Sequence, residues 1–79
     1  GGEHEDFSQE DIELIHKCWD VIRQEKRAST SMLQRRLRLG YNKAAWVVDF
    51  LERILVLGPG EGAKPREILV DLDDFELPI

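Results

Sequence analysis

Two helical patterns separated by a single glycine restrict the fold of this chain more than any other feature. Leu33 and Leu37 lie four residues apart, which places them on one side of a short helix. Gly40 interrupts this pattern, and a longer apolar pattern of helical spacing begins at Tyr41. Two helices joined by a tight glycine-containing turn make a helix-turn-helix. The sequence therefore predicts a small, mainly helical domain built on this motif.

The ends of both helices have local signals. The short helix is predicted from Met32 to about Arg38. Ser31, followed three residues later by Gln34, has the pattern of a capping box in which each side chain bonds the amide of the other residue. The longer helix is predicted to extend from residue 41 to about 55. Its packing face is expected to carry Ala44, Val48, Leu51 and Leu55, with Tyr41 and Ala45 beside them.

The same part of the chain is strongly basic. Residues 26–46 hold six basic side chains and no acidic one, whereas the 79 residues together hold 11 basic and 16 acidic side chains. This separation makes the segment a candidate surface for phosphate, although a solvated basic helix face gives the same pattern. The net charge of −5 argues against a protein that coats nucleic acid without regard to sequence.

A first helix is predicted from about Gln9 to Glu25. Ser8 is a suitable N-cap, and Phe7 with Ile12 fits a hydrophobic staple. Apolar residues of helical spacing provide a core face, namely Leu14, Ile15, Cys18, Trp19, Val21 and Ile22. Because the single cysteine cannot form an internal disulfide, we expect a reducing compartment, the cytoplasm.

The last third of the chain predicts a hairpin and a tail. Residues 56–57 and 66–72 have strand character, and the segment 58–65 between them is rich in turn formers. A hairpin after a helix-turn-helix is a wing, so the expected fold is a winged helix-turn-helix of three helices and a two- or three-stranded antiparallel hairpin. The expected domain covers residues 8–72. It follows an acidic lead-in or added residues at 1–7 and precedes an acidic tail at 73–79 that is either folded back or frayed.

Four segments resemble one known family: residues 28–31 (ASTS), 33–38 (LQRRLR), 39–45 (LGYNKAA) and 64–70 (KPREILV). They are similar to the gamma domain of the FtsK/SpoIIIE DNA translocases, the C-terminal winged-helix module of a bacterial chromosome pump. The resemblance covers about residues 12–72. It implies a role in chromosome segregation, in which the domain reads short, skewed, guanine-rich DNA sequences that orient the motor and contacts the Xer recombinase to activate it. The residues implied in DNA binding are Asn42, Lys43, Arg35, Arg36, Lys64 and Arg66.

The second helix of the motif departs from this family. Trp46 stands where the family has arginine, Phe50 where glutamine or glutamate is expected, and Ile54 where a polar residue is usual. The three lie at i, i+4 and i+8 and would form one apolar stripe. Leu55 also replaces the glycine that normally ends the helix, where a left-handed residue is common.

Three interpretations of the stripe remain open. It can belong to the core, or it can contact thymine methyl groups and sugars in a DNA complex. It can also bind a protein partner or a second copy of the chain, since an apolar strip flanked by charges is typical of a binding hot spot. The third is the leading interpretation, and it fits a natural relative specialised for a protein or a scaffold redesigned as a binder. Its predicted binding residues are Trp46, Phe50 and Ile54, with Val47 and Arg53 at the rim.

Nothing in the sequence favours catalysis. The carboxylates of Asp73 and Asp74 lie on a segment expected to be solvated, and no histidine is placed to activate Ser29 or Ser31. We therefore expect a binding module and not an enzyme. No cofactor, metal, membrane contact or small-molecule substrate is expected, and DNA binding is the alternative to protein binding.

Overall fold

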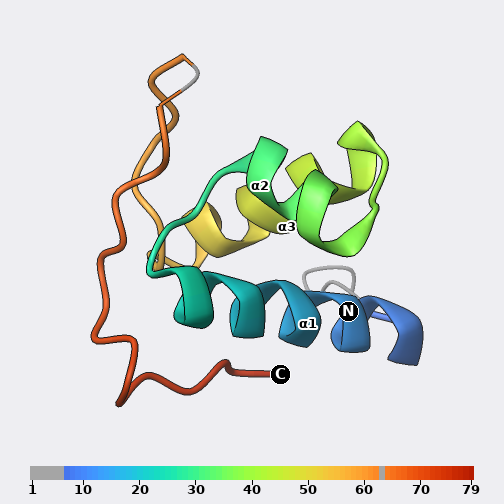
Figure 1. The fold of residues 1–79 in the computed structure, drawn as a ribbon. Helices are drawn as coiled ribbons and strands as arrows, with labels where there is room; N and C mark the ends of the chain where they lie inside the picture. The colour runs from blue at the N-terminus through green and yellow to red at the C-terminus, as the bar shows by residue number, and fades with distance from the viewer. Residues whose placement is uncertain (1–6, 63) are drawn as a thin grey trace.

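The computed structural model describes residues 7–62 and 64–79, and within them it has three helices. They are α1 (Gln9–Glu25), α2 (Thr30–Leu37) and α3 (Tyr41–Arg53). α1 lies along one side of the molecule, and α2 and α3 pack together on the other side (Figure 1). None of the helices in these two ranges is both long enough and apolar enough to cross a bilayer. Of the lead-in predicted for residues 1–7, residues 1–6 lie outside the described part.

The start of α1 is held by the predicted cap. The Ser8 hydroxyl accepts a hydrogen bond from the Asp11 amide at 3.0 Å, and the Asp11 carboxylate accepts one from the Ser8 amide at 3.2 Å. The ring of Phe7 makes edge-on contacts with Trp46 and Phe50 of α3, at centroid distances of 5.8 and 5.2 Å. Phe7, two residues before α1, therefore joins the beginning of this helix to α3.

The start of α2 differs from the prediction. Ser29, not Ser31, is the N-cap, and its hydroxyl accepts a hydrogen bond from the Met32 amide at 3.1 Å. The backbone of Ser29 is extended, as an N-cap requires, and the helix has already begun at Thr30. After α2, Arg38 adopts the left-handed conformation with φ of 55°, so the chain turns there before Gly40. The turn prediction is correct, but the left-handed residue is not the glycine.

α3 buries a wider face than predicted and ends earlier. Ala44, Val48 and Leu51 are buried as expected, but Leu55 is 73% exposed and takes no part in the core. The helix ends at Arg53, and Leu55 has a φ of 65° in the left-handed region. Among the described residues, the core lies between the three helices and the segments beside them and consists of Ile15, Cys18, Trp19, Val21, Ile22, Ala28, Met32, Leu33, Ala44, Val47, Val48, Phe50, Leu51, Val56 and Leu57.

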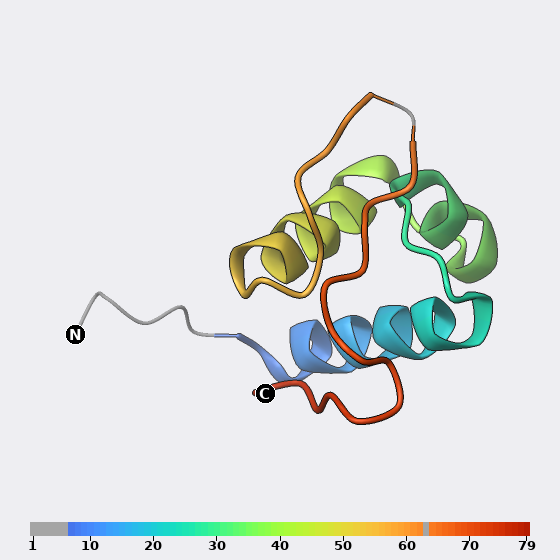
Figure 2. The ribbon, with the colours of Figure 1, turned by 90° about the vertical axis from the view of Figure 1, so that its left-hand side faces the viewer.

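The predicted wing is reduced to two antiparallel bridges in the part of the chain that the structure describes. Ala28 pairs with Arg66, and Leu57 pairs with Ile68. A 2.7 Å hydrogen bond from the Arg66 amide to the Ala28 carbonyl supports the first bridge, and two hydrogen bonds of 2.8 Å flank the second. The described parts of the loop that follows α3, residues 58–62 and 64–65, project beyond α2 and α3, as Figure 2 shows. The second bridge joins the two sides of the loop at its base, and the first holds this base against the segment that precedes α2.

The last residues run back along α1 in the opposite direction. Side chains alternate between partly buried and exposed from residue 75 to residue 79, so one side of this extended segment packs on the core. The red end of the ribbon follows α1 in both Figure 1 and Figure 2. Three contacts in order along the helix join Arg23 to Leu72, Trp19 to Phe75 and His16 to Ile79.

Candidate nucleic-acid interface

The first turn of α3 is open to solvent. Tyr41, Asn42 and Lys43 are all exposed, Tyr41 by 65%. Gly40 is the N-cap and makes no side-chain cap, so the first amides of α3 are not bonded by it. Because unbonded amides give a helix N-terminus a partial positive charge, this end of α3 is electrostatically suited to an anionic partner.

Two hollows meet at this turn. The turn hollow, of about 510 Å³, is lined by residues 38–43 and includes the cations of Arg38 and Lys43. The loop hollow, of about 230 Å³, is lined by Ser29, Thr30, Ser31, Gln34, Tyr41, Gly62, Lys64 and Arg66. Tyr41 belongs to both hollows. The start of α2, the start of α3 and the projecting loop therefore share one continuous surface.

A groove between the N-terminal turns of α1 and α3 adjoins this surface. The α1–α3 groove has a volume of about 490 Å³ and shares Asn42 and Lys43 with the turn hollow. The indole of Trp46 lies beside them on the α3 wall. The α1 wall carries carboxylates, and its residues are Ser8, Glu10, Asp11, Glu13, Leu14 and Lys17.

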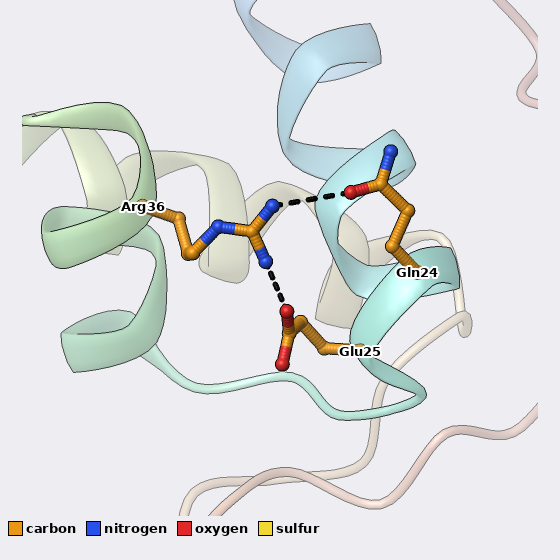
Figure 3. Close-up of polar contacts among 3 residues, drawn as sticks. All are labelled: Gln24, Glu25 and Arg36. Carbon is orange, nitrogen blue, oxygen red and sulfur yellow. Dashed lines mark hydrogen bonds and ion pairs between the residues drawn. The ribbon is translucent and has the colours of Figure 1, made fainter.

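The basic residues predicted for DNA binding are of two kinds in the structure. Arg35 and Lys64, like Lys43, are exposed. Arg36 instead bridges α2 to the end of α1, since its guanidinium bonds the Glu25 carboxylate and the Gln24 side-chain oxygen (Figure 3).

Arg66 has a structural role as well. Its guanidinium donates to the Glu52 carboxylate at 2.6 Å and to the Gly58 carbonyl at 3.1 Å, and its side chain is 18% exposed. These bonds connect the base of the projecting loop to the end of α3. Arg66 nevertheless lines the loop hollow, so its charge contributes to the field there.

The predicted apolar stripe is not an exposed surface. Phe50 is 6% exposed and Val47 is fully buried, so placing the first on an exposed stripe and the second at its rim was wrong. Trp46 and Ile54 are partly buried and pack against the core. The physical reason is Phe7, whose ring covers this side of α3. Whether the residues still exposed there bind a protein stays a prediction.

Arg53, predicted at the rim, is exposed near the end of α3. Its guanidinium carbon lies 5.9 Å from the centre of the Phe50 ring, at the outer limit of a cation–π contact. Together with Phe7, it helps to cover Phe50. Two of the five stripe and rim residues thus belong to the core, two are partly covered, and Arg53 alone of the five is fully on the surface.

Sequence reasoning did not name Tyr41 and Arg38 as site residues. Tyr41 joins the two hollows, and Arg38 lines one of them. Arg38 lies in the basic segment and had a usable signal in its charge. Tyr41 was assigned to the edge of the packing face, and only its 65% exposure in the folded chain reveals its position on the surface.

The one cysteine has no part in this surface. Cys18 is fully buried in α1, and its burial raises the pKa of the thiol from 9.0 to about 11. The thiol therefore remains protonated at neutral pH, whereas a reactive cysteine requires the thiolate. Cys18 is a core residue, as the sequence predicted.

A short helix, a three-residue turn and a second helix with an exposed, basic first turn define a helix-turn-helix. Residues 9–71 match the family described as the Ftsk gamma domain. The chain belongs to this family, whose fold is the winged helix. The predicted resemblance is thereby confirmed, but the predicted wing is not, because the described residues show two isolated bridges in its place.

The relatives are much longer proteins. The chain is 47% identical over 64 residues to a DNA translocase FtsK of Staphylococcus epidermidis, a match that covers 81% of this chain and 8% of that protein. Matches to proteins of the same name have 48% identity over 63 residues in Clostridium acetobutylicum and 46% over 63 residues in Chlamydia muridarum, each covering 80% of this chain and 8% of the relative. The chain thus spans about a twelfth of the length of these relatives.

Proposed function

We propose that this chain binds double-stranded DNA, with α3 in the major groove and the turn and projecting loop on the phosphate backbone. The observation that carries this proposal is the continuous surface on which the exposed first turn of α3 meets cations from the turn and the loop. In helix-turn-helix proteins it is the N-terminal part of the second helix that contacts base edges. The exposed residues of that part are Tyr41, Asn42 and Lys43.

Each residue type on this surface suits a defined contact. Asn42 can bond an adenine edge in two places, and Lys43 can bond a guanine edge or a phosphate. Arg38 and Lys64 flank them on two sides and suit phosphate contacts, which set the orientation of the protein on the duplex. Arg35, exposed on α2, is a further candidate for the backbone.

The acidic remainder of the molecule restricts how DNA is bound. The carboxylates of Glu10 and Glu13 stand on the α1 wall of the groove next to Lys43. Since they repel phosphate, they limit the backbone contacts on that side of α3. Together with a net charge of −5, this favours binding at selected sites over binding to any duplex.

The relatives are DNA translocases, and we extend the proposal to a role within such a protein. The chain would read the direction of a short sequence for the attached motor and would also activate Xer recombination. Protein binding through an exposed apolar stripe on α3 has less support than the sequence indicated, because Val47 and Phe50 are buried. DNA binding is therefore the function that the geometry supports best.

The proposal is tested by titrating a labelled duplex library with the chain over a range of salt concentrations. The binding constant should fall as salt rises, and a plot of its logarithm against the logarithm of the salt concentration should have a slope of about −0.9 for each phosphate contacted. Lys43→Gln and Lys64→Gln should each weaken binding, and a lysine that contacts phosphate should reduce that slope by about one when it is replaced.

Lys26→Gln is the matched control. Lys26 is exposed and basic but lines neither hollow and does not line the α1–α3 groove. We expect its replacement to leave the salt slope unchanged. Absence of binding to any duplex at low salt, or an equal effect of all three substitutions, would contradict the proposed surface.

A further inference from the structure

The outward side of α3 carries one row of side chains. At 100° per residue, Asn42, Trp46, Asp49 and Arg53 fall within about 60° of one another. Asn42, Asp49 and Arg53 are exposed, and Trp46 is partly exposed. If α3 lies in a major groove, this row faces the base edges. Trp46 is therefore the only apolar side chain in the row, and it occupies the position one turn after Asn42.

The indole of Trp46 has a fixed position. The Phe7 ring packs edge-on against the indole, with 5.8 Å between the ring centroids, and the inner part of the indole contacts the core. Its open side lines the α1–α3 groove beside Asn42 and Lys43. An aromatic side chain held in this way loses little conformational entropy on binding, so its contact with a ligand is well defined.

The surroundings indicate what the indole can contact in a DNA complex. Glu10 and Glu13 face it across the groove, and their charges repel phosphate. The indole itself offers one N–H donor and no acceptor, and most of its surface is apolar. The one apolar group that a base pair presents in the major groove is the 5-methyl group of thymine.

We propose that Trp46 determines the sequence specificity of this chain by selecting a thymine through its 5-methyl group. The proposal rests on the DNA binding proposed above. Residues i and i+4 are about 6 Å apart along a helix, and base pairs are about 3.4 Å apart. The selected thymine therefore lies within about two base pairs of the base that Asn42 contacts. Phe50 makes no such contact because it is buried.

The test begins with selection of the preferred duplex from a randomised library by the unaltered chain. Each thymine of that duplex is then replaced in turn by deoxyuridine, which removes the 5-methyl group and leaves the hydrogen-bonding pattern intact. At one position we expect affinity to fall about fourfold, the factor that follows from no longer burying one methyl group. Methylating a cytosine placed at that position should restore part of the affinity.

The same pairs of duplexes are measured with Trp46→Ala and with Asn42→Ala. Trp46→Ala should bind thymine and deoxyuridine equally at that position, whereas Asn42→Ala should bind more weakly but keep the fourfold preference. Trp46→Arg should move the preference at that position to guanine, since arginine bonds guanine in two places. If Trp46→Ala does not fold, as judged by circular dichroism, the unaltered chain and Trp46→Arg still provide the comparison.

The outcomes separate the two proposals. DNA binding with no effect of deoxyuridine at any thymine, or a preferred duplex without thymine, would overturn the role of Trp46 and leave the DNA-binding function standing. A thymine preference that persists in Trp46→Ala would assign the contact to another residue and would also overturn it. No binding to any duplex would reject both the function and the specificity.

Discussion

Leu55 has a backbone conformation that is unfavourable for a residue with a side chain. Its φ of 65° lies in the left-handed region, which costs a residue with a Cβ roughly 1–2 kcal/mol. Leu55 is 73% exposed, so packing of its side chain offsets little of this cost in free energy. The conformation persists because the next residues, Val56 and Leu57, are buried and both donate their amides to the Leu51 carbonyl.

We therefore expect Leu55→Gly to stabilise the chain. Glycine adopts this conformation without steric cost but loses more entropy on folding, so the net gain in the free energy of unfolding should be about 0.5–1 kcal/mol. The measurement is urea denaturation followed by circular dichroism. Leu55→Ala is the control, because it removes the exposed side chain and keeps the strain, and it should change stability by less than about 0.5 kcal/mol. A less stable Leu55→Gly variant would show that the strain argument is wrong.

At the scale of elements, side chains from one helix hold another in place. Phe7 joins the start of α1 to α3, and Arg36 joins α2 to the end of α1. The side chains of Arg36 and Glu25 are each about 40% exposed, so water and salt screen much of the attraction between their charges. Its contribution to stability is consequently small, even though it sets the position of α2 relative to α1.

The two neighbouring arginines of α2 should respond differently to replacement by alanine. Arg36→Ala should lower the free energy of unfolding by less than about 1 kcal/mol, and the loss should shrink at high salt. Arg35→Ala, at an exposed position beside it, should leave stability unchanged and reduce DNA affinity. Thermal unfolding at two salt concentrations and a DNA titration provide both readouts. Equal losses of stability in the two variants would contradict the assignment of Arg36 as the bridging residue.

At the scale of the whole molecule, the last residues complete the cover of α1. Phe75 packs edge-on against Trp19 at 5.7 Å, and the Nε2 of His16 lies 2.8 Å from the main-chain oxygen of Ile79. The Arg23 Nε also donates to the Leu72 carbonyl at 3.2 Å. These contacts leave Trp19 only 4% exposed. The segment lies along α1, so its loss should affect stability more than DNA binding.

Phe75→Ala should lower the free energy of unfolding by about 1–2 kcal/mol, less than the 3–5 kcal/mol typical of a fully buried phenylalanine, because Phe75 is only partly buried. Uncovering Trp19 should also shift the tryptophan emission of the native chain to longer wavelength. The neighbouring exposed residue provides the control, since Glu76→Ala should change neither quantity. An unchanged stability of Phe75→Ala would mean that the segment does not pack on α1 in solution.

The bounds of α1 and the start of α3 could be predicted because their signals are local. The capping box of α1 is formed by Ser8 and Asp11, which are three residues apart, and the apolar residues of α1 recur with helical spacing. Gly40 directly precedes α3. The start of α2 was misplaced by two residues because Ser29 and Ser31 are both good caps. Asn42 and Lys43, which the family resemblance implies in DNA binding, are exposed, and their role in binding stays a prediction.

Neighbouring residues alone predict the three helices, the turn between α2 and α3 and the basic first turn of α3, because helix caps and the helical period depend on short-range contacts. Which side of α3 is covered depends instead on contacts between distant parts of the chain. Phe7 reaches Phe50 across more than forty residues of sequence, and Phe75 reaches Trp19 across more than fifty. Periodicity shows which residues share a helix face. It does not show which distant segment packs on that face, and the burial of the face depends on that segment.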